Sequence, residues 1–122
     1  MARRKILIIE DDPVGRQILH KAVITAGYDV LLASDALSAL TETQRGKPDL
    51  IVLDLGLPAG GGFAFLQRMK SFPRLAIIPI LVVSGQDRAA NEQRALDAGV
   101  LKYMEKPASP EDVLAEIGRL LE

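Results

Sequence analysis

The chain of 122 residues lacks cysteine and tryptophan and has a single histidine. Without cysteine, disulfide bonds, thiolate metal sites and catalysis by a thiol are excluded. The 15 basic and 16 acidic residues nearly cancel, so no overall charge attracts the chain to nucleic acid or to a membrane surface. No apolar run reaches membrane-spanning length, and the run near the N-terminus is too short for a signal-peptide core. We therefore expect a cytoplasmic protein that binds neither nucleic acid nor membrane directly.

The composition predicts a folded domain. Hydrophobic residues make up 48% of the chain and charged residues 25%, which is typical of a globular protein rather than a disordered one. A chain of this length can bury a substantial core but is short for two domains. We therefore predict one domain over residues 1–122.

Short apolar runs alternate five times with longer stretches of helical period. This alternation is typical of β-α units on a parallel sheet. Strands are predicted over residues 6–9, 30–33, 50–55, 77–83 and 101–104, with regular pairing of the fourth only after Pro79. Five helices are predicted to begin at Pro13, after Ser34 or Asp35, near Phe63, at Arg88 and at Pro110. The pattern favours a doubly wound α/β fold, with a five-stranded parallel sheet in the order 2-1-3-4-5.

Helical spacing also predicts which side chains face the core. The expected inward residues are Val14, Ile18, Leu19, Ala22 and Val23 in the first helix, Leu37 and Leu40 in the second, Leu66 in the third, and Val113, Leu114, Ile117 and Leu120 in the last. The helix at residues 88–98 has Leu96 as its only large apolar residue, so we expect it to pack thinly.

Polar residues follow four of the predicted strands. Glu10 and Asp11 follow the first strand, Asp54 ends the third, Ser84 follows the fourth and Lys106 follows the fifth. Because right-handed crossovers bring the carboxyl ends of parallel strands to one edge, we expect these side chains to meet. Each has a simpler interpretation when taken alone: paired acids often cap helices, a serine is often a turn residue, and a lysine is usually solvated. Their occurrence together, in chain order at the strand ends, favours a shared site.

The expected cluster suits phosphoryl chemistry with a hard metal ion. Three carboxylates repel one another unless a cation neutralises them. With no cysteine and with His20 inside the first helix, the predicted ion is Mg²⁺, which accepts one or two carboxylates plus a phosphate. Asp54 could then act as a nucleophile that forms an aspartyl phosphate. Ser84 could donate a hydrogen bond to one phosphoryl oxygen, and Lys106 could supply positive charge to another.

Four motifs together resemble a known family. They are Ile-Ile-Glu-Asp-Asp-Pro at residues 8–13, Ile-Val-Leu-Asp-Leu-Gly-Leu-Pro at 51–58, Val-Val-Ser-Gly at 82–85 and Tyr-Met-Glu-Lys-Pro at 103–107. The set resembles the receiver domain of two-component response regulators over essentially the whole chain. The resemblance implies a flavodoxin-like receiver fold, in which a sensor histidine kinase or a phosphotransfer protein phosphorylates Asp54. It also implies a signalling switch with self-phosphorylation and self-dephosphorylation chemistry only, rather than a turnover enzyme.

The resemblance assigns the metal site residue by residue. Asp11 corresponds to the direct metal ligand and Glu10 to its partner, which usually acts through water. Asp54 and the backbone carbonyl of Gly56 complete the implied protein ligands. Asp12, the third acid of the run, is left as the cap of the first helix.

The resemblance also assigns the phosphate and switch residues. Ser84 and Lys106 correspond to the phosphate-binding pair, and the Lys106–Pro107 bond resembles one that the family holds cis. Tyr103 corresponds to the switch aromatic that turns inward when Ser84 is drawn towards phosphate; an aromatic packed on the last helix is the simpler alternative. The signal is expected on the surface of the helix at 88–98, the strand at 101–104 and the last helix. This surface would bind an unknown output partner, a fused effector domain or a second copy in a homodimer.

The chain departs from the family pattern in two places. Gly56 places no side chain two residues after Asp54, and the loop at 59–62, Ala-Gly-Gly-Gly, lacks the usual Met-Asp-Gly. Access of water and phosphodonors to Asp54 is therefore expected to differ. Leu101-Lys102 replaces the Asp-Asp of the winged-helix transcription factors, which argues against the charged dimer face of that subclass.

Two alternative functions belong to other classes. An α/β phosphatase or phosphotransferase also forms an aspartyl phosphate, but that family expects a second aspartate where this chain has Gly56, and no cap domain is inserted here. A constitutive interaction module would keep the fold without phosphorylation. The presence of all the acids together with Ser84 and Lys106 argues against that module.

Overall fold

The computed structural model describes residues 3–122. Its strands are β1 (Lys5–Ile9), β2 (Asp29–Ala33), β3 (Leu50–Leu53), β4 (Ile80–Ser84) and β5 (Lys102–Glu105). All pairings are parallel and the order is β2-β1-β3-β4-β5, which confirms the predicted fold. Every residue of the central strand β3 is buried, as expected for a parallel sheet that is covered on both faces.

The described helices are α1 (Pro13–Thr25), α2 (Ala36–Gly46), α3 (Gly61–Lys70), α4 (Pro73–Ala76), α5 (Arg88–Asp97) and α6 (Pro110–Leu120), together with the 3₁₀ turn η1 (Pro58–Gly60). Five of these are the predicted helices, and α4 is an additional single turn. Among residues 3–122, no helix combines the length and the apolar composition needed to cross a membrane.

The prediction missed α4 because proline has two roles in this segment. The helix α3 ends before Pro73, as predicted. However, Pro73 also occupies the first turn of α4, where proline fits without losing a needed hydrogen bond. The strand β4 begins at Ile80, directly after Pro79, as expected. Ile77, predicted as a strand residue, lies outside β4 and is 82% exposed.

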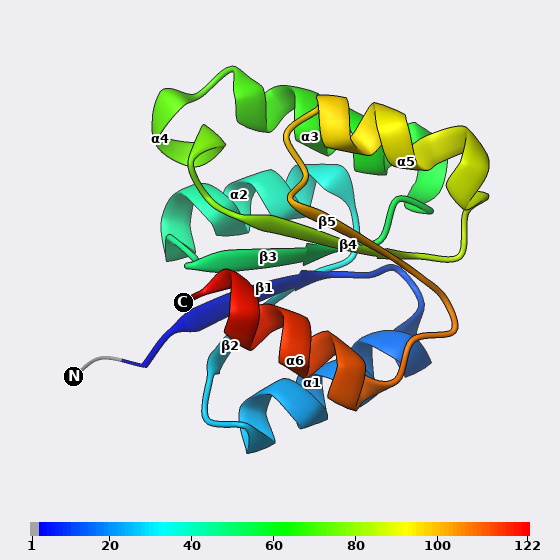
Figure 1. Ribbon diagram of the computed structural model, residues 1–122. Helices are drawn as coiled ribbons and strands as arrows, with labels where there is room; N and C mark the ends of the chain where they lie inside the picture. The colour runs from blue at the N-terminus through cyan, green and yellow to red at the C-terminus, as the bar shows by residue number, and fades with distance from the viewer. Residues whose placement is uncertain (1–2) are drawn as a thin grey trace.

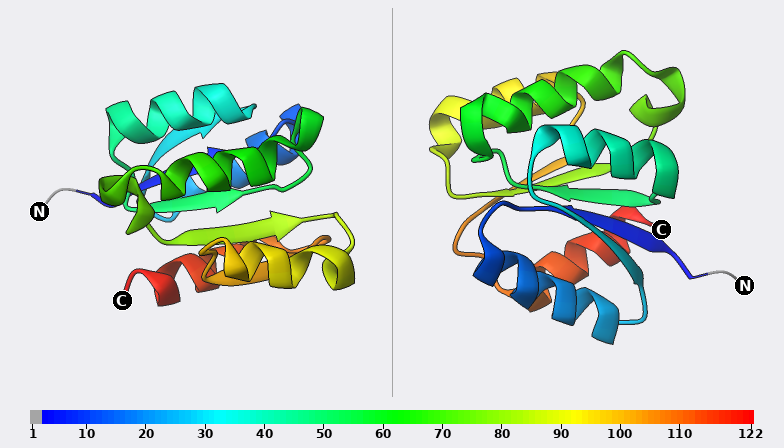
Figure 2. Two further views of the ribbon diagram at one scale, coloured as in Figure 1. Left: turned by 90° about the horizontal axis from the view of Figure 1, so that it is seen from above. Right: turned by 180° about the vertical axis from the view of Figure 1, so that it is seen from behind.

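The helices form one layer on each face of the sheet. Figure 1 shows α1 and α6 on one face and α2, α3 and α5 on the other, and the views in Figure 2 agree. Phe65 and Met69 of α3 pack in one layer of the core. Val23 of α1 and Ile117 of α6 pack in the other. Because both faces are covered, side chains can form an accessible site only at the strand ends.

Two residues predicted to face the core from α1 are exposed instead. Val14 is 66% exposed and Ile18 is 55% exposed. The inward face of α1 runs through Leu19 and Val23, which lie four residues apart. Successive helical residues are rotated by about 100°, so Val14 and Ile18 fall on the neighbouring face.

The inward face of α2 also differs from the prediction. Leu37 is 78% exposed, whereas Ala39 and Thr43 are completely buried. Leu37 lies two residues from Ala39 and so points to the opposite side of the helix. Leu40 is half-buried. The prediction followed the largest apolar residues, but small residues carry the contact because α2 packs closely on its neighbours.

The inward predictions for α3 and α6 are confirmed. Leu66, Val113 and Ile117 are almost completely buried. Leu114 and Leu120 are partly buried and pack against the same cluster as Val113.

The helix α5 packs thinly, as predicted. Ala95 is its only fully buried residue, and Leu96 is 39% exposed. Two guanidinium groups on α5 lie over aromatic rings: Arg94 is 3.8 Å from the centroid of Phe63, and Arg88 is 5.9 Å from that of Tyr103. Cation–π contacts therefore contribute to the packing of α5, whereas the other helices are held mainly by apolar burial.

Candidate functional site

The strand ends bring the predicted polar residues to one edge of the sheet. Glu10 and Asp11 follow β1, Asp54 follows β3, Ser84 ends β4, and Lys106 follows β5. Glu10, Asp54 and Ser84 are 7%, 9% and 0% exposed, whereas Asp11 is exposed. The side chain of Asp12 accepts a hydrogen bond from the Gly15 N–H at 3.0 Å and caps α1, as predicted. The Asp12 side chain therefore serves as the N-terminal cap of α1.

The Lys106 ammonium group holds two of the carboxylates. Its Nζ donates to Glu10 Oε1 at 2.5 Å and to Asp54 Oδ2 at 3.0 Å. The other oxygen of Asp54, Oδ1, accepts a hydrogen bond from the Gly56 N–H at 2.9 Å. Both oxygens of Asp54 are thus positioned by neighbouring groups.

Burial and the lysine together set the charges of this cluster. Burial raises the pKa of Glu10 despite the hydrogen bond from Lys106, and the proximity of Asp54 raises it further. Burial alone would raise the pKa of Asp54, but hydrogen bonds with the Gly56 N–H, Glu10 and Lys106 hold it below its usual range. Burial opposes the charge on Lys106, yet its two carboxylate partners raise the pKa of the ammonium group. Asp54 is therefore ionised at neutral pH, the state in which a carboxylate is a nucleophile.

The donor set beside the lysine fits a hard cation. Glu10, Asp11 and Asp54 each offer a carboxylate oxygen, and these oxygens lie within 4.8 Å of one another. Oxygen-only sites of this kind suit Mg²⁺. Gly56 lies beside them, because a Cβ built on it would be 3.4 Å from Asp54 Oδ1. The residues present therefore fit the magnesium ion that the sequence indicates.

Ser84 and Lys106, the predicted phosphate-binding pair, lie at the ends of neighbouring strands. The Ser84 hydroxyl is buried and accepts a hydrogen bond from the Gln86 N–H at 3.1 Å. The peptide bond between Lys106 and Pro107 is cis. The Lys106 N–H donates to the Ser84 carbonyl at 2.9 Å, so the end of β4 and the residue after β5 are direct neighbours.

Tyr103 points into the protein. It is 2% exposed, and its hydroxyl donates to the Gln86 carbonyl at 3.3 Å. Burial raises the pKa of the Tyr103 phenol. Its ring belongs to the core layer that contains Ala95 of α5, rather than to the layer under α6. The simpler alternative of an aromatic packed on the last helix is therefore wrong.

Gln86 is a residue of this site that the sequence analysis missed. Its backbone contacts both Ser84 and Tyr103. Its side-chain Nε2 lies 3.2 Å from the position that a Cβ on Gly56 would occupy. The amide thus occupies space that a side chain at position 56 would need. Its place two residues after Ser84 in a loop at the same edge is the signal that could have identified it.

A cavity of about 500 Å³ opens beside Asp54. Its walls include Glu10, Asp54, Lys106, Ile18, Leu19 and Val113. The lining thus combines polar groups at the strand ends with apolar side chains of α1 and α6. The exposure of Ile18 on α1 is explained by its position on this wall.

A doubly wound parallel sheet with an acidic cluster at its carboxyl edge defines an α/β protein whose chemistry lies at the strand ends. Residues 6–118 match the response regulator receiver domain. The chain therefore belongs to this family, whose members accept a phosphoryl group in two-component signal transduction and act as regulatory switches.

Three similar proteins illustrate the relationship. The chain is 36% identical over 117 residues to the DNA-binding dual master transcriptional regulator RpaA of Synechocystis, a match that covers 96% of this chain and 48% of RpaA. It is 34% identical over 118 residues to the alkaline phosphatase synthesis transcriptional regulatory protein PhoP of Bacillus subtilis, covering 97% and 48%. The solved chemotaxis response regulator CheY4 of Vibrio cholerae aligns with a TM-score of 0.90 at 28% identity, covering 98% and 100%. The chain spans about half the length of the curated relatives it matches.

Proposed function

We propose that Asp54 is the phosphoacceptor and that residues 1–122 form a single receiver domain. The observation that carries the proposal is the position of the Asp54 carboxylate, buried at the end of β3 and hydrogen-bonded by Lys106 and Gly56. Its lowered pKa keeps it ionised. The cavity beside it gives a phosphodonor a path between α1 and α6.

The proposed donor is a phosphohistidine of a sensor kinase or of a phosphotransfer protein. An oxygen of Asp54 forms a bond to phosphorus while the bond from phosphorus to the histidine nitrogen breaks, and the imidazole leaves with that electron pair. Lys106 compensates the charge of the phosphoryl oxygens, and the Ser84 hydroxyl donates a hydrogen bond to one of them. The only reaction proposed is self-modification and its reversal, rather than turnover of external substrate.

Magnesium is the proposed cofactor. Asp11, Asp54 and the Gly56 carbonyl would hold it directly, with Glu10 acting through water. When bound, Mg²⁺ supplies positive charge that offsets the clustered carboxylates and the incoming phosphoryl group. The grouping of the three carboxylates supports this assignment.

The proposed output surface consists of α5, β5 and α6. Movement of Ser84 towards phosphate would break its contact with Gln86 and change the environment of Tyr103, which also contacts Gln86. The thin packing of α5 supports a shift of that helix. The proposed partners are an output protein, a fused effector domain or a second copy of the chain. By similarity to the regulators RpaA and PhoP, we propose that the protein is cytoplasmic and that its signal controls transcription. In this proposal the receiver domain itself does not contact DNA.

Incubation with Mg²⁺ and a small phosphodonor should add one phosphoryl group to the parent protein and none to an Asp54→Asn variant. The expected result follows because the amide of asparagine is not a nucleophile towards phosphorus. Intact-mass measurement gives the readout. The matched control is Asp12→Asn, which removes a neighbouring charge but keeps a side chain that can cap α1.

An equal gain of phosphoryl mass by the Asp54→Asn variant would exclude the assignment. Steady hydrolysis of a panel of phosphomonoesters by the parent would instead support the alternative of a phosphatase.

Replacing Asp11 by asparagine should weaken Mg²⁺ binding by roughly ten-fold or more, because one of the charged oxygen ligands is lost. Isothermal titration of the ion into the parent and the variant measures the change. The Asp12→Asn variant again serves as the control and should bind Mg²⁺ like the parent. Equal affinities of the parent and the Asp11→Asn variant would remove Asp11 from the proposed ligands.

A further inference from the structure

A second cavity lies at the opposite edge of the sheet, where the strands begin. It has a volume of about 660 Å³, larger than the cavity beside Asp54. Its lining includes Lys47, Pro48, Phe72, Arg74, Leu75 and Ile77. Figure 1 shows α4 at this end of the molecule, far from the carboxyl ends of the strands. We call this cavity the amino-edge groove.

The amino-edge groove combines an apolar lining with exposed apolar residues at its rim. Leu75 and Ile78 are half-buried within it. Phe72 is 37% exposed, and Ile77 is 82% exposed. Water therefore contacts a continuous group of large apolar side chains between α3 and β4, which is a property of surfaces that bind a partner.

Both charged residues that line the groove, Lys47 and Arg74, are basic. Among residues 3–122, neither Lys47 nor Arg74 takes part in an ion pair. Of the acids in neighbouring segments, Glu42 pairs with Arg45 at 2.8 Å, whereas Asp49 accepts a hydrogen bond from the neutral Lys5 N–H at 2.8 Å and keeps its charge.

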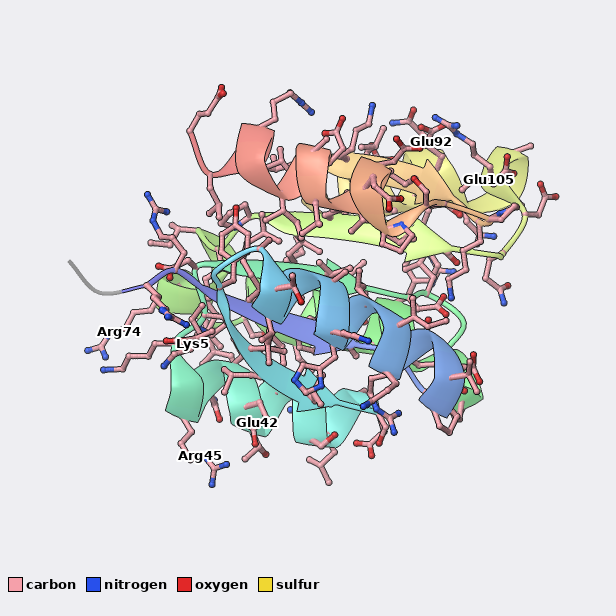
Figure 3. All side chains as sticks on the ribbon, turned by 90° about the horizontal axis from the view of Figure 1, so that it is seen from below. Lys5, Glu42, Arg45, Arg74, Glu92 and Glu105 are labelled. Carbon is pink, nitrogen blue, oxygen red and sulfur yellow. The ribbon has the colours of Figure 1, made fainter. Side chains whose placement is uncertain are left out.

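Figure 3 shows Arg74, Lys5 and Arg45 at one end of the molecule, with Glu42 beside Arg45, and Glu92 and Glu105 at the other end. The lining of the groove itself contains Lys47 and Arg74 but no acidic residue. The groove is therefore complementary to a negatively charged partner.

The backbone at Lys47 has a conformation that side chains rarely adopt. Lys47 follows α2 in the left-handed region, with φ of 50°. Glycine or asparagine usually occupies this position, because other residues are strained there. The lysine side chain is thus present at a position where the backbone favours glycine.

We propose that the amino-edge groove binds an acidic polypeptide segment of another protein. A large apolar side chain of that segment would lie among Phe72, Leu75 and Ile77, and flanking carboxylates would meet Lys47 and Arg74. A small organic anion inside the cavity would leave the rim residue Ile77 exposed, whereas a polypeptide covers it. Because the groove lies at the edge opposite to Asp54, this binding is independent of phosphorylation.

Two synthetic helical peptides with the same leucine stripe test the proposal, one with glutamates and one with lysines on the flanks. The glutamate peptide should bind the full chain and shift backbone amide resonances around Lys47, Phe72 and Ile77. Fluorescence anisotropy should show about ten-fold weaker binding to an Arg74→Glu variant. The lysine peptide should gain affinity for that variant. The control variant Lys21→Glu makes the same change in net charge as Arg74→Glu, at an exposed position of α1. It should leave the affinity for both peptides unchanged.

A Lys47→Gly variant separates binding from folding. It removes the charge and places glycine at a left-handed position, so the melting temperature should not fall while the affinity for the glutamate peptide does. The Asp54→Asn variant should bind the glutamate peptide like the parent, so failure of this proposal and failure of the phosphoacceptor assignment are distinguishable.

Several results would overturn the proposal. These are amide shifts located away from the groove, equal binding of the two peptides, unchanged affinity in the Arg74→Glu variant, and self-association of the chain through the groove. Binding of octanoate or of anionic phosphatidylglycerol vesicles in preference to the glutamate peptide would assign the groove to another occupant.

Discussion

Replacing Lys106 by methionine should lower the free energy of unfolding by about 2 kcal/mol near pH 7. Removal of one partner from a fully buried ion pair costs roughly 3–5 kcal/mol, because the other charge is left without compensation. The Lys106 side chain is 35% exposed while those of Glu10 and Asp54 are 9% and 12% exposed, which reduces the expected effect. Methionine keeps most of the aliphatic length, so the loss reports mainly the charge.

The difference in stability between the parent and the Lys106→Met variant should depend on pH. Folding raises the pKa of Lys106, so its contribution is present below 10.5 and is lost as the pH rises through the folded value. Folding lowers the pKa of Asp54, so its contribution is present above 3.8 and is lost as the pH falls through the folded value. The difference in the free energy of unfolding is therefore largest between these two pH limits and disappears in strong acid.

Glu10 affects stability in the opposite direction. Its pKa is raised on folding, so the parent loses stability as the pH rises from 4.5 through the folded value. Without Lys106 this loss should be larger, because the hydrogen bond that lowers the Glu10 pKa is removed.

Urea unfolding of both proteins across this pH range measures the effect. The control is Lys70→Met, which alters an exposed lysine of α3. Millimolar Mg²⁺ should narrow the difference, because a cation bound to the folded state stabilises it and no ammonium group competes in the variant. Equal stability at pH 7, or a difference that persists in acid, would show that Lys106 does not compensate the carboxylates.

The second large effect is expected at the glycine run after Asp54. A Cβ on Gly62 would lie 2.6 Å from the Leu55 Cα and 2.8 Å from the Leu55 carbonyl oxygen. These are backbone atoms, which cannot move aside as the end of a side chain can. Insertion of a methyl group into such a contact destabilises by about 3 kcal/mol. A Gly62→Ala variant should therefore be less stable than the parent, although alanine favours helices.

The matched control for this variant is Gly118→Ala in α6. No atom lies within 4 Å of the Cβ that it would add. It should raise stability by roughly 0.5–1 kcal/mol, because alanine has the higher helix propensity. Thermal and urea unfolding of the two variants measure the contrast. A stabilised Gly62→Ala variant would contradict the close approach of α3 to Leu55.

The glycine run shows where sequence reasoning stops. The sequence identifies the loop at 59–62 as a departure from the family because it lacks Met-Asp-Gly, but it does not show what its glycines contact. The structure shows why glycine is needed at Gly62, because α3 begins directly against the backbone that follows β3. Tertiary contact between Leu55 and Gly62 leaves no local pattern in the chain, so the prediction could not include it.

The strand ends were more predictable than the helix faces. Short apolar runs followed by Glu10, Asp54, Ser84 and Lys106 define where each strand stops, and parallel pairing brings those ends together. Rotation of a helix about its axis depends instead on its neighbours. Leu37 is exposed although it is large and apolar, because Ala39 lets α2 approach closely. The double pairing of Lys106 and the position of Gln86 likewise depend on side-chain geometry that spacing does not encode.

The sparse packing of α5 has a thermodynamic consequence for the proposed switch. Displacement of α5 would expose little apolar area, since Ala95 is its only fully buried residue. The heat-capacity change on moving the helix should then be small, because that quantity follows the apolar area transferred to water. The enthalpy of the transition would stay nearly constant with temperature. The free-energy difference between the two positions of α5 would then vary almost linearly with temperature, without the curvature that a large heat-capacity change produces.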